Sequence, residues 1–99
     1  MSHPDIDAAF WARADAIIQL ANGQGATVPN SKVSASLLYA AARFNAFVLA
    51  DRSASAEQMK ADKEEAIRYL TEEYRKMLSQ NVDEYIDNFH TYLQRPAVG

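Results

Sequence analysis

Residues 34–50, SASLLYAAARFNAFVLA, form the most apolar stretch of this 99-residue chain, and two polar side chains, Arg43 and Asn45, stand in its middle. The large apolar residues around them recur three and four positions apart, which is the spacing of one helix face. We therefore predict a helix over residues 32–52. Its apolar arc is about 200° wide, broader than one neighbouring helix covers, so we place it at the centre of a bundle.

The same stretch is a poor candidate for a membrane span. A spanning helix needs about 20 apolar residues, and a central arginine costs about 2.5 kcal/mol on insertion. Arg43, Asn45 and two serines lie in this segment, and much of the rest is alanine. We predict that no membrane is a partner of this chain.

The composition narrows the function classes. With 48% hydrophobic and 23% charged residues, the 99 residues fit one ordered domain, residues 1–99. The chain has no cysteine, which excludes disulfides, thiolate metal sites and cysteine nucleophiles. A pI of about 5.2 argues against a nucleic-acid partner. The N-terminal stretch MSHPDIDAAFWARAD lacks the basic start and apolar run of a signal peptide, so we expect a cytoplasmic location.

Three further segments complete an all-α pattern. A first helix is expected over residues 4–22, from Pro4 to the stop signal Asn22-Gly23. A third begins after Ser55, which forms a capping box with Gln58, and runs over residues 56–79. Residues 82–94 form a fourth. We predict a three-helix bundle with a kinked or separate C-terminal helix.

The pattern of the C-terminal third does not decide whether this part of the chain forms one helix or two. Two apolar stripes, one ending at Met77 and one beginning at Val82, are rotated by about 90° on an ideal helical wheel. We favour a break or kink near residues 79–81, although no glycine or proline forces one. The alternative is one helix about 57 Å long, against about 32 Å for the central helix. Its overhang would need a second subunit to cover three aromatic side chains, Tyr85, Phe89 and Tyr92.

The polar residues of the central helix differ in position. Arg43 lies about 120° from the centre of the apolar face and one turn after Tyr39. Its structural role would be a stacking contact or an ion pair, and its functional role an anion or partner contact. Asn45 borders the apolar face, where a buried amide must be hydrogen-bonded. We interpret it as a polar pin that fixes register or assembly, with a ligand contact as the alternative.

Arg13 stands among apolar residues of the first helix. We expect it to pair with a glutamate of the third helix, Glu65, Glu72 or Glu73. If its head is instead held inward, Arg13 and Asn45 share one polar pocket. A carboxylate and His90 at the spacing Asp87-x-x-His90 occur only once, and no partnered nucleophile appears, so we expect no metal, no cofactor and no catalytic residue.

Three stretches, FWARADAIIQLANGQ, KVSASLLYAAARFNAFVLA and KEEAIRYLTEEYRKMLSQNVDEYIDNF, together resemble a family of short proteobacterial proteins that is a domain of unknown function. The resemblance covers residues 10–89 and implies a bacterial, stand-alone helical domain. It implies no activity, ligand or site residue.

These observations favour a non-enzymatic helical protein–protein interaction module that self-associates or binds an unidentified protein. The alternative is a small-molecule binder, or an enzyme of unfamiliar type, with a pocket near Arg13, Asn45 and Tyr74. An enclosed pocket where these three groups converge would favour the alternative.

Overall fold

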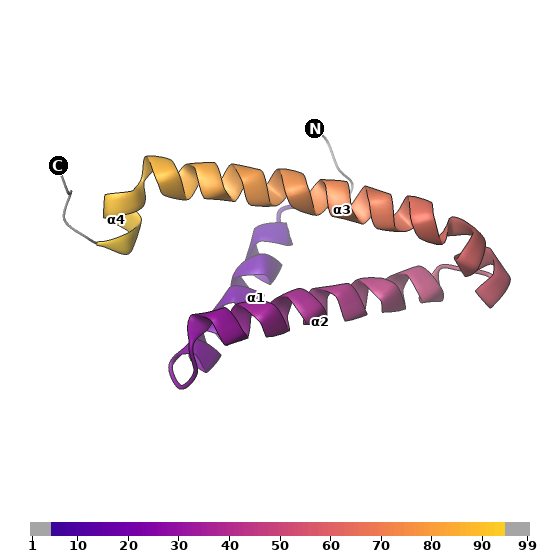
Figure 1. Cartoon of the computed structure of the whole chain (residues 1–99), viewed down its shortest axis with the longest axis horizontal. Helices are drawn as coiled ribbons and strands as arrows, with labels where there is room; N and C mark the ends of the chain where they lie inside the picture. The colour runs from indigo at the N-terminus through magenta and orange to yellow at the C-terminus, as the bar shows by residue number, and fades with distance from the viewer. Residues whose placement is uncertain (1–4, 95–99) are drawn as a thin grey trace. The chain divides into compact units, whose positions relative to one another are not determined.

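A computed structural model describes residues 5–94 of the chain. These residues are 83% helical and include no strand, which confirms the all-α class and a short helix at the C-terminal end. The chain divides into two compact units. Helices α1 and α2 belong to the first, which ends at Arg52, and helices α3 and α4 belong to the second, which begins at Ser53 (Figure 1). We describe each unit by itself, and the packing of three helices into one bundle stays a prediction.

Helix α1 (Phe10–Gly25) begins later and ends later than the sequence indicates. Pro4 lies outside the described residues. The Asn22-Gly23 pair does not stop the helix, because no glycine among the described residues adopts the positive φ that such a stop requires. The helix ends instead before Pro29, which disfavours helical geometry in the residue preceding it.

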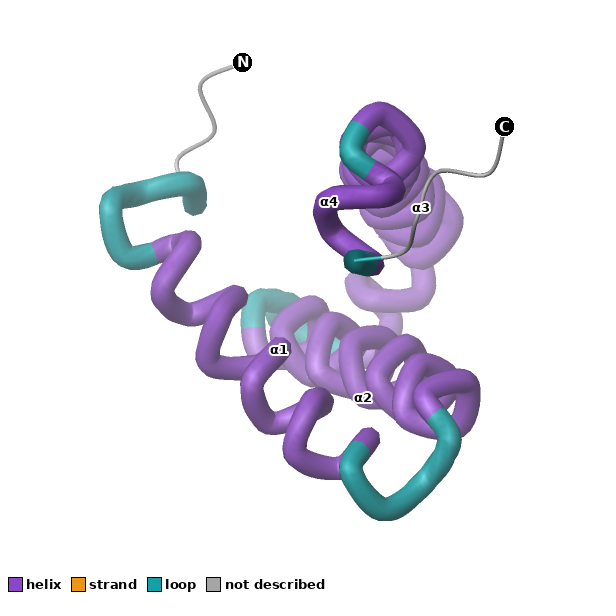
Figure 2. The backbone as a smooth tube through the Cα atoms, turned by 90° about the vertical axis from the view of Figure 1, so that its left-hand side faces the viewer, coloured by secondary structure: helices purple, strands orange, loops and turns teal. Residues whose placement is uncertain are grey.

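Helix α2 (Asn30–Asp51) agrees with the prediction within two residues at each end. It follows α1 after a short loop, and the two helices contact each other (Figure 2). The loop is tight: a Cβ at Gly25 would lie 2.5 Å from the Asn30 Oδ1, so only glycine fits without a shift of that side chain. Val33, in the first turn of α2, is the only buried residue among those the structure describes, and it is 9% exposed.

Helix α3 (Ala56–Asp87) begins as predicted. The Ser55 hydroxyl accepts a hydrogen bond from the Gln58 backbone N–H at 3.1 Å, which satisfies one of the free donors at the helix start. The reciprocal half of the capping box does not form, and the Gln58 side chain points along its own helix, where its Nε2 donates to Asp62 Oδ2 at 2.9 Å. The cap is therefore a single side-chain contact.

The structure corrects the position of the C-terminal break. Helix α3 continues through residues 79–81, where the Asn81 amide donates to the Met77 carbonyl at 2.7 Å and so follows its own helix rather than capping a new one. The chain leaves helical geometry at Asn88, with φ −120° and ψ 26°, and resumes in α4 (Phe89–Leu93). The two apolar stripes together fill about 180° of a straight helix, so one continuous helix presents both.

Candidate functional site: exposed apolar faces

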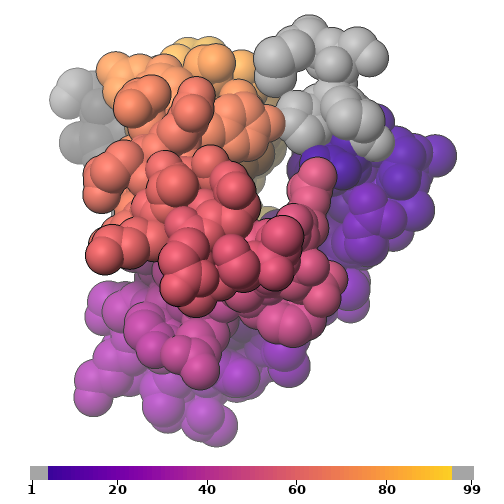
Figure 3. Space-filling model, turned by 90° about the vertical axis from the view of Figure 1, so that its right-hand side faces the viewer, coloured from indigo at the N-terminus to yellow at the C-terminus, as the bar shows by residue number. Residues whose placement is uncertain are grey.

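Large apolar side chains are exposed throughout both units. Apart from Val33 no described residue is buried, whereas 22 large hydrophobic side chains are at least 38% exposed. Figure 3 shows the surface that these helices present. Monomeric soluble proteins rarely expose contiguous apolar patches of more than a few hundred Å². The candidate site is therefore a set of surfaces rather than a pocket.

One of these surfaces is the C-terminal hook, which we define as residues 82–93, the end of α3 together with α4. The break at Asn88 turns α4 back so that the Tyr85 and Tyr92 rings meet edge to face, with centroids 5.0 Å apart. The hook thus brings together the predicted interface residues Tyr85, Phe89 and Tyr92, which are 51%, 41% and 46% exposed. The fold holds these rings at a surface without covering them.

Glu84 ties the two parts of the hook together. Its carboxylate raises the pKa of the Tyr92 hydroxyl above the ordinary 10.0, chiefly because the negative charge lies close by. The Asn88 amide donates to the Glu84 backbone carbonyl at 2.9 Å, across the break. The Glu84 carboxylate is therefore close to Tyr92 of α4, and the Glu84 carbonyl accepts the side chain of Asn88 at the end of α3.

The hook also contains a side chain that the sequence analysis did not select. Ile86 is 65% exposed, the largest value among the hook's apolar residues. Its spacing of four residues from Val82 was the available signal, because positions four apart lie on the same side of a helix. Ile86 therefore belongs with the three aromatic residues.

The face of α2 around Arg43 is exposed as well. Tyr39, one turn before it, is 68% exposed, and Phe47, one turn after it, is 60% exposed. Asn45 is also exposed within its unit, and its role as a polar pin that fixes register or assembly stays a prediction. By length and composition alone, α2 could cross a membrane, a test that apolar core helices of soluble proteins also pass.

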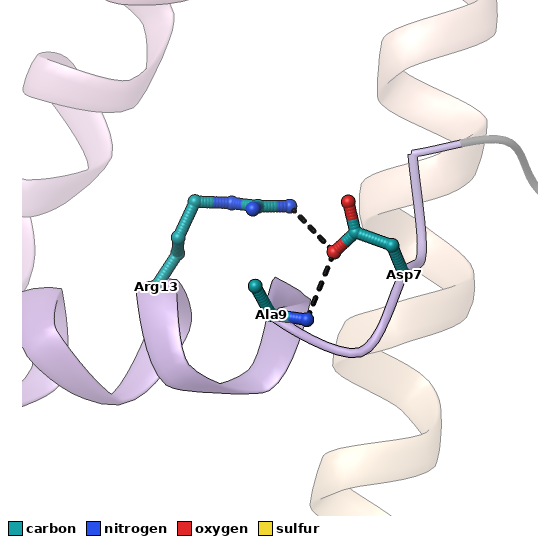
Figure 4. A network of polar contacts seen from close by, with 3 residues as sticks. All are labelled: Asp7, Ala9 and Arg13. Atoms are coloured by element: carbon teal, nitrogen blue, oxygen red, sulfur yellow. Dashed lines mark hydrogen bonds and ion pairs between the residues drawn. The ribbon is translucent and has the colours of Figure 1, made fainter.

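Arg13 has a local partner. Its Nη2 lies 3.2 Å from the Asp7 Oδ1, and this oxygen also accepts the Ala9 backbone N–H at 3.0 Å (Figure 4). This ion pair fastens the start of α1, and the pairing of Arg13 with a glutamate of α3, which belongs to the other unit, stays a prediction. Both charged side chains are more than half exposed, so Arg13 is not held in a buried polar pocket within its unit.

The remaining expectations concern a shared pocket and a metal site. Tyr74 belongs to the second unit and Arg13 and Asn45 belong to the first, and the pocket near all three stays a prediction. Within the described residues, His, Asp and Glu side chains form no group of three that could hold a metal ion.

A comparison with protein families matches residues 10–86 to a family described as proteins of unknown function, DUF3144. The chain belongs to the DUF3144 family. The match covers more than half of the chain and confirms the predicted resemblance to an uncharacterised domain family, while the proteobacterial source stays a prediction. Curated proteins and solved structures give no match. The DUF3144 match includes α1, α2 and nearly all of α3, and it ends within the C-terminal hook.

Proposed function

We propose that this chain is a helical protein–protein interaction module that self-associates and has no catalytic activity of its own. The observation that carries the proposal is the burial pattern: one buried residue, Val33, against 22 exposed large hydrophobics in the described part of the chain. The proposal names a second copy of the chain as the partner.

The energetics of folding support this proposal. Ordering one residue costs about 1.5 kcal/mol in conformational entropy, and burial of apolar surface is the main term that offsets it. The second unit contributes no buried residue of its own within the described range. Most of the stability of a helix in a protein comes from packing of its apolar face, so these helices need a surface that covers those faces.

The lengths of the helices support the proposal that another molecule covers part of the apolar face of α3. Helix α3 has 32 residues and α2 has 22, which correspond to about 48 Å and 33 Å. However the two are arranged, α2 covers at most about two-thirds of the length of α3. A second copy supplies the missing length without any other protein.

The charge distribution supports a protein partner over nucleic acid. The net charge is −3, and α3 alone carries nine acidic and five basic residues. A surface of that sign repels phosphate groups. The cytoplasmic location stays a prediction that accompanies this proposal.

Sedimentation equilibrium over a concentration range of about 1–100 μM tests the proposal, because it spans the range in which weak to moderate self-association appears. We expect the mass to rise with concentration from the 11.0 kDa of one chain to twice that value. A mass of one chain at every concentration, together with full helicity in circular dichroism, would show that the chain folds alone.

A further inference from the structure

Helix α3 has one face on which a second helix could pack along its whole length. Its centre line consists of eight positions spaced alternately three and four residues apart: 60, 63, 67, 70, 74, 77, 81 and 84. This spacing is typical of helices that pair side by side. The middle four positions are Ile67, Leu70, Tyr74 and Met77, and three of them, Ile67, Tyr74 and Met77, are 47%, 49% and 47% exposed. We call these eight positions the seam of α3.

The charges on the seam differ between its two ends. Lys60 and Lys63 occupy the first two positions, and Asn81 and Glu84 occupy the last two. On an ideal helical wheel, the two lysines and Glu84 are the only charged residues of α3 within about 60° of the centre of this face. The seam is therefore basic at its N-terminal end, apolar in the middle and acidic at its C-terminal end.

We propose that the α3 helices of two copies pair antiparallel along this seam, with Glu72 level with the twofold axis. This inference rests on the proposed self-association and specifies the surface through which the two copies meet. Glu72 also lies at the middle of α3, so the two helices overlap along their full length. Lys60 of one copy then lies opposite Glu84 of the other, and this pair occurs twice because the contact is reciprocal.

The middle of the seam pairs apolar side chains with each other. In this alignment Ile67 of one copy lies opposite Met77 of the other, and Leu70 lies opposite Tyr74. Each of these contacts also occurs twice, so four consecutive apolar layers fill the centre of the pair. Their burial supplies the packing that stabilises a helix in water.

Asn81 suits the position opposite Lys63. Its Nδ2 donates to the Met77 carbonyl of its own helix at 2.7 Å, which leaves its Oδ1 as a hydrogen-bond acceptor. The ammonium group of Lys63 is a donor with no acceptor capacity. The antiparallel alignment therefore brings a donor to an acceptor at this layer.

A parallel pair along the same seam is unfavourable. It would place Lys60, Lys63 and Glu84 each opposite its own equivalent, so like charges would meet at both ends of the pair. Like charges placed opposite each other across an interface destabilise a complex, whereas complementary charges fix its register. The charge pattern of the seam therefore selects the antiparallel orientation.

The antiparallel alignment contains one like-charge contact, which gives a test of orientation. Glu73, on the flank of the seam, lies near its equivalent across the twofold axis. The Lys76 Nζ lies 3.9 Å from the Glu73 Oε1 of the same helix and partly neutralises it. Glu73→Gln should lower the dissociation constant about two- to fivefold, because it removes this repulsion. In a parallel pair Glu73 would lie beside Leu78, so unchanged or weaker association would contradict the alignment.

The pair is compatible with the C-terminal hook. The Glu84 carboxylate is close to Tyr92 as well as opposite Lys60, and its two oxygens can accept hydrogen bonds from both side chains. Val82 and Ile86 lie on the flank of the apolar face that the second α3 does not cover. These two side chains remain available to the other helices of the dimer.

Charge reversal within α3 tests the inference. Lys60→Glu and Glu84→Lys each place like charges opposite each other at both ends of the pair, so each variant should raise the dissociation constant about 10- to 100-fold. Both substitutions in one chain restore opposite charges, and the dissociation constant should return to within about threefold of wild type. Lys60 and Glu84 are 24 residues, or about 36 Å, apart on one helix, so this recovery requires two copies. Sedimentation equilibrium of the whole chain measures each constant.

Two control variants make the same changes in net charge away from the seam. Arg68→Glu matches Lys60→Glu, and Asp83→Lys matches Glu84→Lys, since Arg68 and Asp83 lie about 140° and 160° from the centre of the face. Their dissociation constants should stay within about threefold of wild type, as exposed pairs contribute little. Asp83→Lys and Glu84→Lys both place a base at the negative end of the helix dipole, so their comparison separates association from helix stability.

The outcomes are distinguishable. A wild-type chain that stays single at every concentration refutes the proposed function, and this inference with it. A wild-type dimer that neither reversal weakens refutes the antiparallel seam alone, and so does a combined variant that fails to recover or a control that weakens the dimer equally. If circular dichroism shows that Lys60→Glu loses helicity at saturating concentration, Glu84→Lys decides, because its base favours the end of the helix.

Discussion

Replacement of Ile86 by alanine isolates the contribution of one exposed side chain to association. Ile86 is 65% exposed within its own unit, so about two-thirds of its surface is available to a second copy. Full burial of an isoleucine side chain contributes about 1.5–3 kcal/mol, and about two-thirds of that is about 1–2 kcal/mol. A reciprocal dimer contains the position twice, so the variant loses about 2–4 kcal/mol of association free energy.

We therefore expect the dissociation constant of Ile86→Ala to rise about 30- to 700-fold, at 1.4 kcal/mol for each factor of ten. Sedimentation equilibrium measures this change, and circular dichroism at the same concentrations measures helicity. Gln80→Ala is the matched control, because Gln80 is exposed on the same helix about 120° away on the helical wheel. An Ile86→Ala dissociation constant equal to that of the control would refute the assignment of the hook to an interface.

Three further predictions concern single features of the fold. Ser55→Ala removes the acceptor for the Gln58 N–H and should lower the free energy of unfolding in urea by about 1 kcal/mol. Ser55→Asp should retain most of that stability, because its carboxylate can also accept this hydrogen bond. Equal losses in both variants would contradict the cap. Tyr92 should deprotonate above pH 10.0 in an absorbance titration, and Glu84→Gln should lower its pKa towards that value. Since the raised pKa favours the neutral phenol in the folded state, this contribution to stability is complete below pH 10.0 and is lost as the pH rises through the higher pKa of the folded state. Finally, the chain should not float with neutral or anionic lipid vesicles, because insertion of α2 would bury Arg43 at a cost of about 2.5 kcal/mol; co-flotation would show that a membrane covers the apolar faces.

Sequence pattern predicted α2 well because its signals were redundant. The spacing of apolar residues, the length of the stretch and the proline before it all indicate the same helix. The end of α3 was placed incorrectly because the signals there conflict. Asn81 is typical of a cap by residue type, yet its amide binds the carbonyl of Met77 within an unbroken helix. Two stripes that differ by about 90° fit the same half of one helix, so the rotation alone is not evidence of a break.

The partner of Arg13 illustrates a second limit. A helical wheel shows which residues share its face, but it does not include the extended segment before the helix. Asp7 lies in that segment, six residues away, and reaches back to Arg13 at 3.2 Å. The aromatic residues of the hook could be selected from the sequence because their spacing places them on one apolar stripe, and their role at an interface stays a prediction. What covers an apolar face depends on a second surface, which the pattern of one chain does not describe.

Val33 is the only buried residue in the range 5–94, and together with the proposed self-association this predicts how the protein is turned over in the cell. Proteases cleave chains in proportion to the fraction that is open. A chain that folds only when it associates with a second copy is largely unfolded at low concentration and protected from proteases at high concentration. Its half-life then lengthens as its own concentration rises, so its steady-state level responds more than proportionally to the rate of synthesis. Under the proposed self-association, we therefore expect weak expression to yield almost no protein and expression above a threshold to yield a stable pool of pairs.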